Sequence, residues 1–193
     1  VPEDKKPQRE AELDERLLAT PALALERCRT LIADMASYAM ESMRESLGAV
    51  LACTPKTAEH IREDEARTDH YEDIIGSYLV KLSARKIGET DSALAAEYLR
   101  LIGDFERIAD HSVNILESAE ELKNKGISFS PAARQEYQIM SAAVREVTGL
   151  AYTAFVTGDI GAARRIEPLE QVIDDLKEEL RTRHIRRMQQ GTC

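Results

Sequence analysis

Acidic side chains recur at helical spacing in two segments of the chain, and their types and spacing suit them to bind cations. In the first segment Glu65 and Asp69 are four positions apart, and Glu72 follows three positions later. On a helical wheel that starts from Ile61, Glu65 and Asp69 fall at the margin of the apolar stripe rather than opposite it, and Glu72 lies nearer its centre. Carboxylates are seldom buried unless a cation balances them, so we expect arginines or a metal ion beside these three.

The second segment carries one polar row at i, i+4 and i+3 spacing. Its members are Glu106, Asp110, Asn114 and Glu117. Hard oxygen ligands at this spacing can hold a divalent or trivalent cation, and two such rows on adjacent helices can hold a metal cluster with bridging carboxylates. The row lies roughly opposite Phe105 and Ile108, and a row facing away from the apolar stripe is also typical of a solvated surface. Spacing alone leaves both interpretations open.

Long helices must position these residues. The 193-residue chain has only 9 Gly and 6 Pro, its aromatic content is 5%, and Trp is absent. This composition favours an all-α protein with thin aliphatic layers over a β-sandwich or barrel. Thr20-Pro21 and Ser130-Pro131 are typical helix starts, and Pro168 is expected to kink the last helix or to reset its start. The apolar periodicity predicts five helices, over about 21–52, 57–85, 92–123, 131–156 and 160–190.

The sequence also repeats itself. Two sets of residues align one for one, namely Ile61, Glu65, Asp69 and Ile75 with Ile166, Glu170, Asp174 and Leu180. If the repeat unit is three helices, the second unit lacks its last helix. We therefore expect a polar linker at 1–20, a first three-helix repeat at 21–126 and an incomplete second repeat at 127–193. Helices without their third partner would expose apolar side chains such as Ile173 and Leu180, which favours a homo-oligomer or docking onto the missing segment.

Charge and motif content exclude several classes of protein. The formal net charge of -9 argues against a nucleic-acid partner. Three scattered cysteines fit neither a disulfide framework nor a CxxC metal site, and no apolar run is long enough to span a membrane. No Ser/His/Asp or Cys/His arrangement, P-loop or glycine-rich phosphate cradle can be placed. We therefore expect that the protein is not an enzyme.

The second acidic segment contains a motif that resembles one of a known protein family. The string Glu106-Arg107-Ile108-Ala109-Asp110-His111-Ser112-Val113-Asn114-Ile115 resembles the motif of the PhoU phosphate-uptake regulators, an E-R-I-x-D core followed by a polar residue and Ile. Glu65-x-x-x-Asp69, matched by Glu170-x-x-x-Asp174, resembles the other acidic element of that family. The resemblance implies PhoU-like repeated three-helix bundles, here about five long antiparallel helices with the last helix of the second repeat missing.

The resemblance also implies metal ions bound to carboxylates on the bundle surface. Iron, zinc, magnesium and calcium are the candidates. The implied ligands are Glu65, Asp69, Glu106, Asp110, Asn114, Glu170 and Asp174. The family would follow Cys193 with a second E-R-x-x-D-H-x-x-N helix, which this chain does not contain. Half of the implied metal site therefore cannot form from these residues alone.

Within the family, the chain is most similar to the cytoplasmic PhoU-type domain attached to bacterial Na/Pi cotransporters. The segment 13–26 resembles the linker that leaves the last membrane helix of the transporter, and the segment 167–174 resembles the fifth helix of that subfamily. The resemblance implies a regulatory domain of a membrane protein, at the cytoplasmic face of the inner membrane. Its partner would be the transmembrane part of a sodium-dependent phosphate transporter, and phosphate is a candidate ligand.

Two other functions are candidates. A free-standing PhoU-type regulator would act on an ABC phosphate transporter and its sensor kinase, and hydrophobic spans upstream of Val1 would distinguish the cotransporter from it. A carboxylate-bridged di-metal oxidase is the third candidate. Such enzymes face their ligands inward and use Glu-x-x-His pairs, which no helix here supplies.

Overall fold

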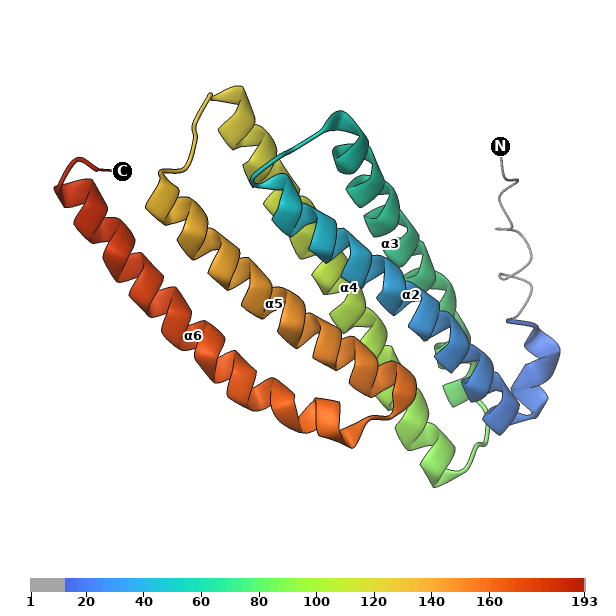
Figure 1. Cartoon of the computed structure of the whole chain (residues 1–193). Coiled ribbons are helices and arrows are strands. Elements are labelled where there is room, and N and C mark those ends of the chain that lie inside the picture. The colour runs from blue at the N-terminus through green and yellow to red at the C-terminus, as the bar shows by residue number, and fades with distance from the viewer. Residues whose placement is uncertain (1–12, 193) are drawn as a thin grey trace.

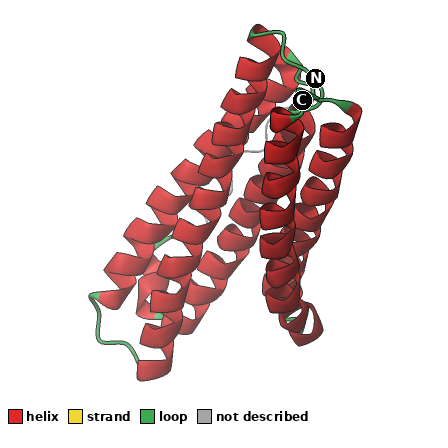
Figure 2. Ribbon diagram, turned by 90° about the vertical axis from the view of Figure 1, so that its left-hand side faces the viewer, coloured by secondary structure: helices red, strands yellow, loops and turns green. Residues whose placement is uncertain are grey.

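The computed structural model describes residues 13–192, and over these residues every regular element is a helix. The elements are η1 (Glu15–Ala19), α2 (Pro21–Ala49), α3 (Pro55–Ser83), α4 (Glu89–Asn124), α5 (Pro131–Thr157) and α6 (Ile160–Gln189). Successive long helices run antiparallel (Figure 1) and are joined by short loops (Figure 2). The predicted all-α fold class is confirmed. Residues 1–12, which form most of the linker predicted at 1–20, and Cys193 lie outside the described residues.

The helices begin where local chemistry allows. Proline occupies the first position of α2, α3 and α5, where its missing N–H costs no hydrogen bond. Before α3, the hydroxyl of Thr54 accepts a hydrogen bond from the Thr57 amide at 3.1 Å. Between α5 and α6, Gly158 adopts a left-handed conformation with φ of 70°, and the Asp159 carboxylate accepts from the Ala162 amide at 3.1 Å. These caps reproduce the predicted helix starts to within about three residues.

Of the two outcomes expected for Pro168, a reset of the helix start is wrong. The helix α6 runs from Ile160 to Gln189 with Pro168 inside it, so its start is not reset there. Proline removes one backbone donor and leaves the carbonyl four residues earlier without its partner. Both Pro168 and Arg164 are exposed. Water can satisfy the freed carbonyl, which explains why the helix continues.

The first three long helices form one bundle. Helix α2 packs against both α3 and α4, which also pack against each other. The apolar residues that recur along α2 at alternating steps of three and four are buried from Leu25 to Leu47, and Val50, just after the helix, is partly exposed. Burial raises the pKa of the Cys28 thiol in this stripe to about 12, so Cys28 acts as a small apolar side chain.

The core of this bundle is divided by a polar layer. One apolar cluster centres on Leu31, Met35 and Leu79, and a smaller one at the other end includes Ile61 and Leu116. The buried polar side chains between the two clusters are Ser42, Ser46, Asp64, Thr68 and Ser112. Three of these hydroxyls donate to carbonyls of their own helix, as that of Thr68 does to Asp64 O at 2.8 Å. Asp64 is the only buried charge in the described part of the chain.

Helices α5 and α6 form a hairpin beside the bundle. Helix α5 lies on α2, and α6 packs chiefly against α5, so the hairpin lies to one side of the bundle (Figure 1). Among the described residues, Ser141 is the only buried residue of α5 and Ala162 the only one of α6. Ile173 and Leu180, expected to be exposed, are half-buried. The exposed large apolar residues of α6 are instead Ile160, Val172, Ile185 and Met188.

Polar contacts fasten this hairpin at both ends. The Tyr137 hydroxyl donates to the Leu47 carbonyl at 2.8 Å, and Arg29 donates to the Val156 carbonyl at 3.2 Å. Within the hairpin, the carboxylate of Glu136 near the start of α5 meets the guanidinium of Arg187 near the end of α6 at 2.7 Å. Apolar contacts add to these, since Tyr152 and Phe155 of α5 pack against the larger core cluster and the ring centroids of Phe155 and Phe105 are 5.7 Å apart. None of the helices in residues 13–192 combines the length and the apolar character that a membrane span requires.

Candidate functional site

Acidic side chains of α3 and α4 come together on one side of the bundle. We call Glu65, Asp69 and Glu72 of α3 with Glu106 and Asp110 of α4 the carboxylate cluster. The pKa of Glu65 is raised, first by partial burial and then by the negative charges of Asp69, Asp110 and Glu106. Glu65 and Glu106 are half-buried, whereas Asp69 and Asp110 are exposed. Four of the seven predicted ligands thus lie within electrostatic reach of one another.

Glu72 belongs to the same cluster although it was not among the predicted ligands. Partial burial raises its pKa, and the charges of Glu106, Asp69 and Asp73 raise it further. Its Oε1 lies 3.6 Å from the point where a Cβ on Gly103 would be. Gly103 therefore leaves room for Glu72 to lie against α4. The position of Glu72 near the centre of the apolar stripe was the signal in the sequence.

Asn114 lies one turn beyond Asp110 and is linked to it. Its amide nitrogen donates to the Asp110 carbonyl at 3.0 Å and lies 3.4 Å from Asp110 Oδ2. This contact orients the Asp110 carboxylate and leaves the amide oxygen of Asn114 as a further hard donor. Asn114 therefore adjoins the carboxylate cluster from α4.

Glu170 and Asp174 lie apart from the other five predicted ligands. Both are exposed on α6, which packs chiefly against α5 rather than against α3 or α4. Lys177 is 3.8 Å from Asp174, a distance typical of a loose surface ion pair. The fold thus separates the two acidic elements that the sequence repeat pairs.

The donor chemistry of the carboxylate cluster fits a hard cation, but its side chains do not already converge. Carboxylate and amide oxygens are the ligands that Mg²⁺, Ca²⁺ and Mn²⁺ prefer. Within residues 13–192, however, no three Asp, Glu, His or Cys side chains are close enough together to hold a metal ion as placed. Binding would require these side chains to rotate toward a common point. Since Asp69 and Asp110 are exposed, they have the freedom to do so.

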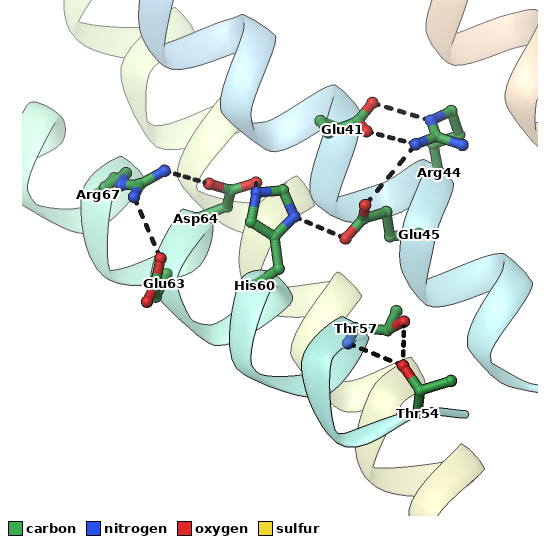
Figure 3. Close-up of polar contacts among 9 residues, drawn as sticks. All are labelled: Glu41, Arg44, Glu45, Thr54, Thr57, His60, Glu63, Asp64 and Arg67. Carbon is green, nitrogen blue, oxygen red and sulfur yellow. Dashed lines mark hydrogen bonds and ion pairs between the residues drawn. The ribbon is translucent and has the colours of Figure 1, made fainter. Parts of the chain in front are cut away.

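A second cluster, which the sequence did not predict as a site, joins α2 to α3 (Figure 3). Its centre is Asp64, whose side chain is 1% exposed and whose Oδ1 accepts from Arg67 at 2.9 Å. His60 lies between two carboxylates, with Nδ1 2.8 Å from Glu45 Oε2 and Nε2 3.8 Å from Asp64 Oδ2. The two ring nitrogens of His60 face different carboxylates. His60 is therefore placed to link Glu45 and Asp64 by polar contacts rather than to bind one metal ion together with them.

The electrostatics of this second cluster follow from burial and pairing. Burial raises the pKa of Asp64, and the positive charges of His60 and Arg67 oppose that rise. The hydrogen bond to Glu45 raises the pKa of His60. Asp64 follows Ile61 by three positions within the buried stripe, with His60 and Arg67 one turn away on either side. That pattern, an acid inside a stripe and flanked by cations, was the signal that could have identified it.

Comparison with known protein families agrees with this arrangement. The family model described as the PhoU domain matches residues 32–119 and 137–193, well over half of the chain. The matched segments contain every predicted metal ligand. No curated protein and no solved structure matches the chain significantly. The PhoU family is regulatory and non-enzymatic, and it is linked to phosphate uptake. From its sequence match and its helical architecture, the chain belongs to the PhoU family.

Proposed function

We propose that this chain is the cytoplasmic regulatory domain of a sodium-dependent phosphate transporter, and that it modulates phosphate uptake through metal ions bound at the carboxylate cluster. Family membership supports the regulatory role in phosphate uptake. The observation that carries the metal proposal is the closeness of four carboxylates from two helices, since the charges of Asp69, Asp110 and Glu106 raise the pKa of Glu65 beyond the effect of its partial burial. Like charges brought this close repel one another unless a cation lies between them.

The ligands of the first metal site would be Glu65, Asp69, Glu106 and Asp110, with the amide oxygen of Asn114. A cation bound there would offset the repulsion between α3 and α4 and would fix the tilt of one helix against the other. Open coordination positions on the metal would accept an anion such as phosphate. Glu170 and Asp174 would contribute to a second site only together with acidic side chains from outside this chain.

The N-terminal segment gives a path from this site toward a transporter. The segment 13–26 is the part that resembles the cotransporter linker, and it is anchored to α3. The Tyr78 hydroxyl donates to the Asp14 carbonyl at 3.0 Å, and Lys81 meets Glu15 at 2.7 Å. Leu18 is buried in the core. A change in the tilt of α3 would therefore move the linker, which supports mechanical coupling to a membrane partner.

The metal proposal is tested by thermal unfolding of the metal-free protein in the presence of Mn²⁺, Fe²⁺, Zn²⁺, Mg²⁺ or Ca²⁺. At a metal concentration about a hundredfold above Kd, binding stabilises the folded state by about 2.7 kcal/mol. For a chain of this size that corresponds to a rise in Tm of about 5 °C or more. The Asp110→Asn variant is expected to lose most of this rise. Glu97→Gln, which removes an exposed carboxylate elsewhere on α4, is expected to keep it.

Two outcomes would contradict the metal proposal. If none of the five metals raises Tm, or if Asp110→Asn responds like the unchanged protein, the carboxylate cluster does not bind metal. The role in phosphate uptake is then tested separately, by comparing phosphate uptake in cells that carry the gene and in cells that lack it. Equal uptake at both low and high external phosphate would refute the regulatory role.

The free-standing regulator of an ABC transporter and its sensor kinase is the alternative within the same family. The complete reading frame distinguishes the two. Several apolar spans upstream of Val1 would identify the transporter domain, because each transmembrane helix needs about 20 apolar residues. A reading frame without such spans would identify the free regulator.

A further inference from the structure

A cleft lies between α2 and α5, where the hairpin meets the bundle. Its volume is about 410 Å³. Clefts of about 300–1,000 Å³ are typical of small-molecule sites, so an organic ligand fits it better than a lone ion does. Each helix contributes four residues at i, i+3, i+4 and i+7 spacing. The cleft is lined by Ser37, Met40, Glu41 and Arg44 of α2 and by Arg145, Thr148, Gly149 and Tyr152 of α5.

Two guanidinium groups share this cleft, and one of them has no carboxylate partner. Arg145 makes a long hydrogen bond of 3.4 Å to the Arg44 carbonyl, and it forms no ion pair with any side chain of residues 13–192. Arg44 is held by Glu41 through Nε, at 2.8 Å, and through Nη2, so its Nη1 stays available. Glu45, which does not line the cleft, lies 3.8 Å from the same Nη2 and offsets part of the charge of Arg44, so Arg145 is the cation left to attract an anion. Guanidinium groups with free donors are the groups that bind phosphate oxygens best.

The remaining walls suit an organic part. Met40 and Tyr152 present a thioether and an aromatic ring, against which a planar apolar group can pack. Gly149 keeps the cleft open, because no atom lies within 4 Å of the place where its Cβ would be. The carboxylate of Glu41 can accept hydrogen bonds from hydroxyl or amino groups of a ligand.

We propose that this cleft binds a small organic phosphate monoester of the size of a nucleoside monophosphate. Its phosphate would bind to Arg145 and to Nη1 of Arg44, and its base would pack against Met40 and Tyr152. The cleft lies between the two polar contacts that fasten α5 to α2, Tyr137 with Leu47 and Arg29 with Val156. A ligand there bridges the hairpin and the bundle, so its binding sets how firmly α5 and α6 are held. This site is independent of the carboxylate cluster and of the proposed metal.

The test is isothermal titration calorimetry of the 193-residue chain with adenosine 5′-monophosphate, adenosine and orthophosphate, all in EDTA so that no metal mediates binding. We expect the monophosphate to bind at least about tenfold more tightly than either fragment, because each fragment makes only part of the contacts. Arg145→Gln is expected to weaken binding at least about tenfold. Arg134→Gln removes an exposed arginine from the same helix and should leave binding unchanged.

A second variant guards against loss of folding. Gly149→Leu fills the cleft at a point where an added Cβ meets no atom, so it should fold and yet abolish binding. The Glu65→Gln variant should bind the monophosphate normally, which separates this site from the metal proposal. The inference is overturned if the monophosphate gives no binding at millimolar concentration, if folded Arg145→Gln or Gly149→Leu binds as tightly as the unchanged chain, or if orthophosphate binds equally well.

Discussion

The imidazole Nδ1 of His60 on α3 lies 2.8 Å from Oε2 of Glu45 on α2, so a titratable group joins two helices of the bundle. This hydrogen bond raises the pKa of His60 above its ordinary value of 6.5. The stabilisation is therefore full below about pH 6.5 and is lost as the pH rises through the folded pKa. Asp64 and Arg67 of α3 also face the ring, the first favouring its charge and the second opposing it.

Replacing His60 is accordingly expected to cost more folding stability at acidic pH than at basic pH. His60→Gln should destabilise the protein by up to about 1 kcal/mol at pH 5.5 and by less at pH 9, since the side chain is 42% exposed and partly screened. Urea unfolding at the two pH values measures the difference. His111→Gln, which removes an exposed histidine from α4, is the control. An equal cost of His60→Gln at both pH values would contradict the assignment.

The buried carboxylate of Asp64 makes Arg67 important to stability. Arg67→Ala removes the partner 2.9 Å from a side chain that is 1% exposed, and we expect a loss of about 2–3 kcal/mol in the free energy of unfolding. Arg107→Ala breaks an exposed pair with Asp104 and should cost less than about 1 kcal/mol.

A double variant separates two causes of the lost stability in Arg67→Ala, namely the unpaired charge of Asp64 and the loss of packing by the arginine side chain. In Arg67→Ala combined with Asp64→Asn, no charge is left buried, so the protein should regain at least about 1 kcal/mol relative to Arg67→Ala alone. Chemical denaturation of the four proteins gives this coupling. Strict additivity of the two single losses would show that the pair does not act through its charges.

Glu65 is predicted to destabilise the metal-free protein at neutral pH. Its pKa is raised above the ordinary value of 4.5, so the folded state holds the proton more tightly than the unfolded state does. The penalty is present above the folded pKa and disappears as the pH falls below about 4.5. Glu65→Gln should therefore raise the stability in EDTA at pH 7 by up to about 1 kcal/mol, and it should leave the stability near pH 4 almost unchanged. A lower Tm for Glu65→Gln at pH 7 would mean that this carboxylate has an unrecognised favourable partner.

The hairpin should open far more readily than the bundle. Helix α6 has Ala162 as its only buried residue, whereas α2 alone buries Leu31, Ile32 and Met35 completely. Amide hydrogen exchange is therefore expected to be at least about a hundredfold faster in the middle of α6 than in the middle of α2, because opening α6 exposes little apolar surface. Mass spectrometry of peptides from both helices measures this. Equal protection would imply that α6 is covered in solution, for example by a second copy of the chain.

Local patterns in the sequence were sufficient to predict the helices themselves. Proline at the first position of α2, α3 and α5, and apolar residues at alternating steps of three and four, act within one or two turns. The acidic rows, such as Glu106 with Asp110, are likewise a property of one helix. The local pattern left open whether Pro168 resets the start of α6, because continuation of the helix depends on whether the freed carbonyl meets water.

Only the tertiary structure decided which of these rows meet. The sequence repeat treats Glu65 and Glu170 alike, yet Glu65 faces Glu106 and Asp110 while Glu170 lies exposed on α6. Likewise, Glu45 and His60 are fifteen positions apart, and Arg145 reaches the Arg44 carbonyl across 101 positions. The physical reason is that the packing of whole helix faces sets which side chains become neighbours, whereas the local pattern fixes only the face on which each side chain lies.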